Sequence, residues 1–259
     1  MRCIFCRQPS VDCKTVEHII PESLGNKEHL LPNGVVCDKC NWYFGTKVEK
    51  ELLDQPFFKH LRHRQDVRTK HGKSVPWKAY SLFPVQNPEK YINSGMTKEQ
   101  LFEEMLKQGN LFYSPFIPTP KPDDIIVSRF LAKVGMEAMA HICVKNSLSL
   151  NEVIDNEALN PLRDYARYGN GKFWPYSQRL IYDENKLWTD DSSPQYQLVH
   201  EYNIISFKQH EYYVVLAIFG WEFSMNLGNR NLDSFIQWLV DNKQVSPLSF
   251  EQFPTPYTI

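Results

Sequence analysis

Two CxxC pairs, Cys3-Ile-Phe-Cys6 and Cys37-Asp-Lys-Cys40, decide the fold of the N-terminal part of the chain. A CxxC pair places two thiolates on one side of a tight turn, and two such pairs supply the tetrahedral set that Zn²⁺ prefers. Residues 7–36 separate the pairs, a longer gap than the roughly 15–20 residues common in such sites. The pattern predicts a structural zinc held by all four cysteines, with further structure inserted between the pairs. Redox-active cysteine pairs are the alternative.

The inserted segment carries a histidine close to oxygen donors that could ligate a divalent ion. It contains the stretch Glu17-His18-Ile-Ile-Pro and, further on, Asn33, while Asn41 directly follows the second pair. A histidine, with an unperturbed pKa of about 6.5, can deprotonate water near neutral pH. Carboxylate and amide oxygens favour Mg²⁺ or Mn²⁺ as ligands, and such an ion stabilises the charge that develops on a phosphate.

This ordered combination resembles the HNH endonucleases of the ββα-metal superfamily, with a zinc-stapled core, over about residues 1–55. The resemblance implies that His18 is the general base and that Glu17 and Asn41 ligate a catalytic Mg²⁺ or Mn²⁺. It also implies that Asn33 pins the loop that orients His18. Two positions depart from the commonest family pattern, since Glu17 replaces Asp and Asn41 replaces His, but both keep an oxygen donor.

Each of these residues also has a purely structural interpretation. His18 could be a buried histidine beside the zinc, Asn33 with Gly34 is a turn signal, and Asn41 could cap the helix expected at residues 38–53. Because adjacent residues of a strand point to opposite sides, Glu17 and His18 converge on one ion only if the strand bends.

Basic residues are in excess in the N-terminal part of the chain, and many of them follow this segment. Residues 1–73 hold 13 Lys or Arg against 9 Asp or Glu, whereas the totals of 29 and 30 leave the remainder acidic. Lysine and arginine that replace condensed counterions give salt-sensitive, sequence-independent affinity for nucleic acid. A solvated charged face is the alternative. The expected phosphate contacts are Lys47, Lys59, Arg62, Arg64, Arg68, Lys70 and Lys73.

The sequence predicts an α+β fold: a small zinc-stapled ββα-metal module followed by a larger α+β domain with several helices and a β-hairpin. We expect the module at residues 1–56, a basic connecting segment at 57–79, and a domain without an assigned role at 80–259. Helical patterns occupy residues 97–108, 123–145, 160–168 and 232–240, and the hairpin pairs residues 196–207 with 211–219.

The expected compartment is a reducing cytoplasm. The first motif begins at Cys3, which leaves no room for a leader, and the longest apolar run, residues 212–219, is too short to cross a membrane. In that compartment six cysteines are better explained as metal ligands or core residues than as disulfides. Cys13 and Cys143 lack partners at ligand spacing and are expected in the core.

The favoured function is a metal-dependent DNA endonuclease that nicks one strand, because the sequence holds one base and one catalytic ion site. We expect low sequence specificity, and the resemblance suggests a bacterial setting such as defence against phage. One alternative is a zinc-stapled nucleic-acid-binding module whose nuclease is silent. Another is a nuclease released only by a protein partner or ligand bound to the C-terminal domain.

Overall fold

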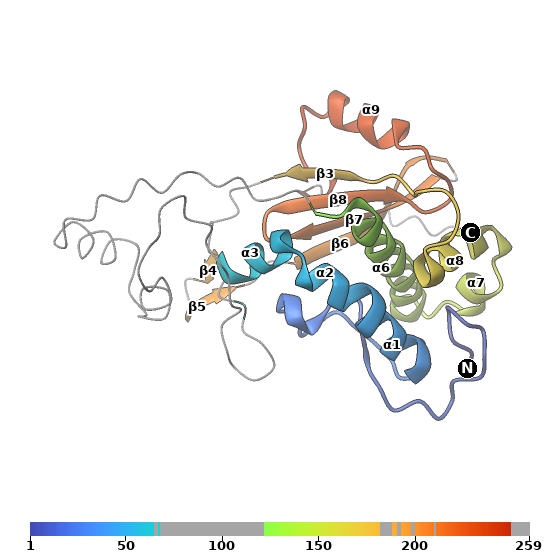
Figure 1. Ribbon diagram of the computed structural model, residues 1–259. Helices are drawn as coiled ribbons and strands as arrows, with labels where there is room; N and C mark the ends of the chain where they lie inside the picture. Colours follow the sequence, from blue (N-terminus) through green and yellow to red (C-terminus); the bar gives the residue numbers. More distant parts are fainter. Residues whose placement is uncertain are drawn as a thin grey trace, which may run out of the picture. The chain divides into compact units, whose positions relative to one another are not determined.

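The computed structural model describes residues 1–64, 67, 122–181, 188–190, 193–197, 200–209 and 211–249. Within these residues the chain combines helices with antiparallel strands, which confirms the predicted α+β class (Figure 1). The helix expected at residues 97–108 lies outside the described part. Among the described helices, none has both the length and the apolar character needed to cross a membrane.

The N-terminal part has the predicted ββα order. Strands β1 (Glu17–His18) and β2 (Leu30–Leu31) form an antiparallel hairpin, with Glu17 opposite Leu31 and His18 opposite Leu30. Helix α1 (Asp38–Phe44) follows the second cysteine pair, and a π-helical turn (Gly45–Glu49) joins it to α2 (Lys50–Asp54). The helical pattern at residues 38–53 is therefore confirmed.

Most of the remaining elements build a four-stranded sheet and its covering helices. The sheet has the antiparallel order β3-β8-β7-β6, and β4 pairs with β5 in a separate two-stranded ladder. The elements are α3 (Pro56–Arg64), α6 (Asp124–Lys145), α7 (Asn151–Ile154), α8 (Asn160–Tyr168), β3 (Ser177–Leu180), β4 (Trp188–Asp190), β5 (Ser193–Gln197), β6 (His200–Lys208), β7 (Glu211–Ile218), β8 (Trp221–Asn226) and α9 (Asp233–Asp241).

The central strand β7 shows how the sheet separates two layers. Val214 and Leu216 belong to the core cluster that contains α6, whereas Tyr213 and Val215 pack with Phe235 of α9. This alternation follows from the two-residue period of a strand. Helices α6 and α9 accordingly cover opposite faces of the sheet (Figure 1). The predicted hairpin is confirmed as β6 and β7, and the last predicted helix as α9.

Helix α6 is capped by Asp123 at its N-terminus. The Asp123 side chain accepts hydrogen bonds from the backbone N–H groups of Ile125 and Ile126, at 2.9 and 3.0 Å, which satisfies two donors that the helix cannot. Most of its residues from Val127 to Ala140 are buried. A helix that is apolar on nearly all sides packs inside a protein, not on its surface.

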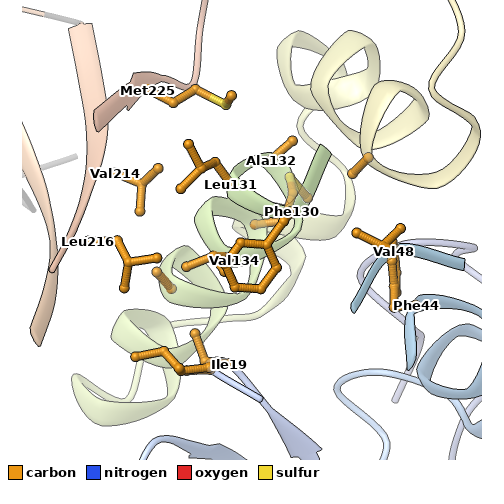
Figure 2. Packing of buried hydrophobic residues seen from close by; sticks show 14 of the residues in the cluster. Ile19, Phe44, Val48, Phe130, Leu131, Ala132, Val134, Val214, Leu216 and Met225 are labelled. Carbon is orange, nitrogen blue, oxygen red and sulfur yellow. The ribbon is translucent and has the colours of Figure 1, made fainter. Parts of the chain in front are cut away.

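A single hydrophobic core joins the ββα part to the sheet. Its buried residues run from the first cysteine pair through α1 and α2 to α6, α8 and the sheet face that α6 covers. Figure 2 shows Phe130 and Val134 of α6 with Phe44 and Val48 on one side and Leu216 of the sheet on the other. Helix α6 is thus shared by both halves of the chain.

The first part of the expected connecting segment is a packed helix. In α3, Phe57 and Phe58 are buried, and their rings lie 5.2 Å from Trp221 and 6.5 Å from Phe223, between ring centroids. The sequence predicted a connecting segment here, because the basic residues that follow these aromatics are typical of a solvated linker. Phe57, Phe58 and Leu61 nevertheless have helical spacing.

Candidate active site and zinc centre

The four cysteines come together as predicted. Their sulfur atoms all lie within 4.8 Å of one another, and the Sγ atoms of Cys6 and Cys37 are 3.6 Å apart. Tetrahedral Zn²⁺ with Zn–S bonds of 2.3 Å separates its sulfur ligands by about 3.8 Å. Among the described residues no other group of histidine, cysteine or acidic side chains gathers in this way. The donor set therefore fits a structural zinc ion.

One of the four thiols, that of Cys3, has a lowered pKa. A hydrogen bond from Cys40 lowers the pKa of Cys3, and burial acts against it. The same hydrogen bond raises the pKa of Cys40. The backbone N–H of Cys37 donates to the Cys3 sulfur at 3.4 Å. A thiolate is thus favoured at Cys3, and thiolate is the form that ligates zinc.

Cys13 and Cys143 remain outside the cluster. Cys143 is buried in α6, which agrees with its predicted core position. Cys13 is half-buried and lines a pocket beside the zinc centre. The lining of this pocket comes from the N-terminal part and from Arg167 of α8 and comprises Cys6, Gln8, Pro9, Cys13, Cys37, Asp38, Lys39 and Arg167.

His18 ends the first strand of the hairpin, and its side chain is half-buried. The start of α1 is tied to the residues just before this strand. Asp38 accepts hydrogen bonds from the backbone N–H and the hydroxyl of Thr15, at 3.0 and 2.6 Å. These hydrogen bonds lower the pKa of Asp38. The Asn41 amide donates to the carbonyl of Val16 at 3.1 Å. Asn41 is therefore held beside the strand that carries His18.

The loop between the two strands is held by Asn26, which is 2% exposed. Its amide nitrogen donates to the carbonyls of Ile20 and His29, at 2.6 and 3.2 Å. Its amide oxygen accepts from the backbone N–H groups of Glu28 and His29, both at 3.0 Å. The side chain thus bridges residues just after His18 to residues just before its strand partner.

Asn33 was expected to pin this loop, and the structure corrects that expectation. Asn33 is exposed and precedes Gly34, whose φ of +89° marks a turn. Gly34 is needed there, because an added Cβ would lie 2.5 Å from the Ser10 carbonyl oxygen. Asn33 is thus a turn residue, and the hydrogen bonds that hold the loop are made by Asn26. The tight Gly25-Asn26 turn was the available sequence signal.

Glu17 is buried and belongs to a charged cluster centred on Lys133 of α6. The Lys133 ammonium lies 2.8 Å from Glu17, 2.7 Å from Glu49 and 2.9 Å from Glu137, and its side chain has no exposed surface. It also donates to the backbone carbonyl of His18 at 3.1 Å. One cation from the second half of the chain thus contacts both residues of β1.

The pKa values in the cluster reflect its burial. Burial raises the pKa of Glu17, and the charge of Lys133 acts in the opposite direction. Burial likewise raises the pKa of Glu137 well above its usual value. For Lys133 burial acts to lower the pKa, yet the charges of the three carboxylates raise it well above its usual value. The lysine is therefore the common partner of the three acidic side chains.

Comparison with known proteins finds a family match in the N-terminal part of the chain. Residues 3–57 match the HNH endonuclease family. This part of the chain is therefore similar to an HNH module, and residues 3–57 are called the HNH module below. The match supports a nuclease, a hydrolase that acts on nucleic acids, and implies that the module binds nucleic acid. No curated protein and no solved structure matches the chain.

Of the two predicted ligands of a catalytic ion in the HNH module, Glu17 does not fit that role as it lies, whereas Asn41 keeps a suitable atom. One Glu17 carboxylate oxygen contacts the Lys133 ammonium, and the other is buried without a hydrogen-bond partner among the described residues. Because the residue is only 4% exposed, a phosphate-bound ion cannot reach this second oxygen without rearrangement. Asn41 has committed its amide nitrogen to Val16, so its amide oxygen is the atom still suited to an ion.

The predicted phosphate contacts divide into four groups. Lys47 is exposed, as a contact requires. Lys59 forms an ion pair with Asp54 at 3.1 Å. Arg62 is 8% exposed, and burial lowers its pKa, which corrects its assignment as a surface contact. The side chain of Arg64 and residues Arg68, Lys70 and Lys73 lie outside the described residues.

Sequence reasoning missed Lys133 entirely. The residue lies in an apolar helix with Glu137 one turn later. A Lys–Glu pair at positions i and i+4 is usually a surface feature. Within a helix this apolar, however, the pair indicates a buried charge that needs partners from elsewhere, and this was the available signal.

Proposed function

We propose that the protein is an endonuclease that hydrolyses phosphodiester bonds of DNA, with His18 as general base. The observation that carries the proposal is the HNH match over residues 3–57, with His18 on a hairpin held against the start of α1. In the reaction His18 takes a proton from a water molecule. The water oxygen then bonds to phosphorus as the bond to the leaving oxygen breaks, and that oxygen takes up a proton.

One HNH module supplies one base, so each encounter is expected to cut one strand. The products are therefore nicked circles before linear DNA. The chain shows no base-reading element in its sequence, and backbone contacts by exposed lysines such as Lys47 carry no sequence information. Low sequence specificity follows from this.

The deciding experiment is cleavage of supercoiled plasmid with Mg²⁺, with Mn²⁺ or with EDTA. Wild type should produce open circles, and His18→Ala should produce none. His29→Ala is a matched control, because it removes a half-buried histidine of the same hairpin loop whose ring contacts the carbonyl of His200. It should cut like wild type. Linear product without a nicked intermediate would contradict nicking, and cutting by His18→Ala would exclude His18 as the base.

A silent or partner-gated module is the second candidate, and one observation favours it. Glu17, an expected ion ligand, is held in a buried ion pair with Lys133. If the wild-type protein binds DNA but leaves it intact with every divalent ion, the result supports this candidate. The second half of the chain would then be tested for binding of a protein partner or ligand. If it cuts in Mg²⁺ alone, this candidate fails.

The proposal includes a role in bacterial defence against phage, and only the resemblance to stand-alone HNH effectors supports this role. Phage plaquing on cells that produce wild type or His18→Ala tests it. Equal plaque numbers on both strains would remove this role without touching the nuclease activity.

A further inference from the structure

Lys133 is the most unusual polar residue among those that the structure describes. It lies in the middle of α6, has no exposed side-chain surface, and contacts three carboxylates and one backbone carbonyl. Of the three carboxylates, Glu17 and Glu49 belong to the HNH module, and Glu137 belongs to α6 itself.

Stability alone does not explain a lysine at this position. Removing charges from water is costly, and well-packed apolar residues often stabilise a protein as much as a buried ion pair does. The neighbours of Lys133 in α6, Ala132 and Val134, are buried apolar residues. A methionine would suit such surroundings, provided that the carboxylates were replaced too.

The contacts of Lys133 with β1 suggest what the lysine does. It holds the side chain of Glu17 and the main chain of His18, two consecutive residues, from one atom. The side chains of consecutive strand residues point in opposite directions. Contacts of Lys133 with both the Glu17 side chain and the His18 carbonyl therefore restrict rotation of the strand about its own axis. The direction of the His18 imidazole depends on that rotation.

We propose that Lys133 is a positioning residue for the nuclease reaction: it anchors β1 through Glu17 and the His18 carbonyl, so that α6 sets the orientation of the general base. Glu17 is then the ion-pair partner of Lys133 and not a ligand of the catalytic ion. The proposal rests on the proposed function, and it makes the second half of the chain part of the nuclease.

The main test uses full-length Lys133→Met with Arg179→Met as the matched control. Arg179 is the cation paired with the buried Glu222 at 2.5 Å, so its loss also leaves a buried carboxylate without its cation, but in the sheet. Misplacing a catalytic group typically costs about 100-fold in rate. Lys133→Met should slow single-turnover plasmid nicking by about this factor, with DNA affinity within about twofold of wild type.

The control variant should stay within about twofold of the wild-type rate, and Lys133→Arg, which keeps a cation, should recover part of the lost rate. A Lys133→Met protein that cuts at the wild-type rate would overturn the proposal. Faster cutting would also overturn it, because Lys133 would then be withholding Glu17 from an ion.

Glu17→Gln tests the other half of the proposal. Loss of a group that supports metal binding commonly weakens the metal affinity 10- to 100-fold. If Glu17 serves only Lys133, the Mg²⁺ concentration that gives half-maximal rate should not change in Glu17→Gln. A rise of about tenfold or more would assign Glu17 to the ion and overturn this part.

A readout independent of activity separates this proposal from the proposed function. In protein labelled with ¹³C at histidine Cε1, the His18 resonance, assigned by its loss in His18→Ala, should shift in Lys133→Met and stay in place in Arg179→Met. If wild type cuts nothing, the proposed function fails, yet this shift still supports the positioning contact. A resonance unmoved in Lys133→Met would overturn it.

Discussion

Replacing Asn26 by alanine should damage the hairpin that carries His18, whereas replacing Asn33 should not. The Asn26 side chain makes four hydrogen bonds with the backbone on either side of the loop. The exposed Asn33 makes no side-chain hydrogen bond among the described residues. The two asparagines lie seven positions apart in one segment, so one serves as the matched control of the other.

The four contacts allow the magnitude to be worked out. A hydrogen bond contributes about 0.5–1.5 kcal/mol net, with the higher values for buried groups. The hydrogen bond to the Ile20 carbonyl is buried and contributes about 1.5 kcal/mol to stability. The other three hydrogen bonds are partly buried and contribute about 0.5 kcal/mol each. Asn26→Ala should therefore lower the free energy of unfolding by about 3 kcal/mol, a fall in Tm of about 6–12 °C.

Urea denaturation and calorimetry of the zinc-loaded full-length protein measure this effect. Asn33→Ala should lie within about 0.5 kcal/mol of wild type, as surface substitutions usually do. If Asn33→Ala destabilised the protein as much as Asn26→Ala, the assignment of the loop contacts to Asn26 would be refuted. If neither variant changed the stability, the whole loop network would contribute nothing.

Three further perturbations test the zinc centre, a buried histidine and the packing of α6. Cys40→Ser should lose zinc and the fold of the HNH module together, because zinc binding supplies folding free energy in such motifs; full zinc content by atomic absorption with normal protease resistance would contradict this. Burial lowers the pKa of His200, which donates to the Leu24 carbonyl, to about 4. Since the unfolded chain keeps a pKa of about 6.5, it binds more protons between these values, so stability should fall by about 3 kcal/mol as the pH drops from about 6.5 to about 4. His200→Gln should show a flatter pH dependence in urea titrations, and an unchanged slope would exclude His200 as its source. Gly135→Ala should destabilise by about 1 kcal/mol despite the better helix propensity of alanine, because its Cβ would lie 2.4 Å from Leu227; a higher Tm would show that Leu227 moves aside without cost.

Local features were predictable from the sequence because neighbouring residues determine them. A CxxC pair forms one tight turn, so the spacing of the four cysteines was enough to predict the cluster that the structure contains. The structure shows that single residues fix the ends of two helices in the same local way. Asp123 caps α6, and Gly169, with a φ of +66°, ends α8.

Roles that depend on distant partners were not predictable. Asn26 and Asn33 are both loop asparagines, and only the path of the hairpin brings four backbone groups to one of them. Arg62 lies in a basic run, yet its helix packs on the sheet through Phe57 and Phe58, and this carries the arginine inside.

By itself the sequence was enough to predict an N-terminal segment similar to an HNH module with four clustered cysteines, because the spacing of metal ligands is a property of short segments. Only the tertiary structure decided what Glu17 contacts. Lys133 lies more than a hundred residues from it along the chain, and no local rule relates the two positions. A buried carboxylate requires a partner wherever the fold can supply one, and here the shared helix α6 supplies it.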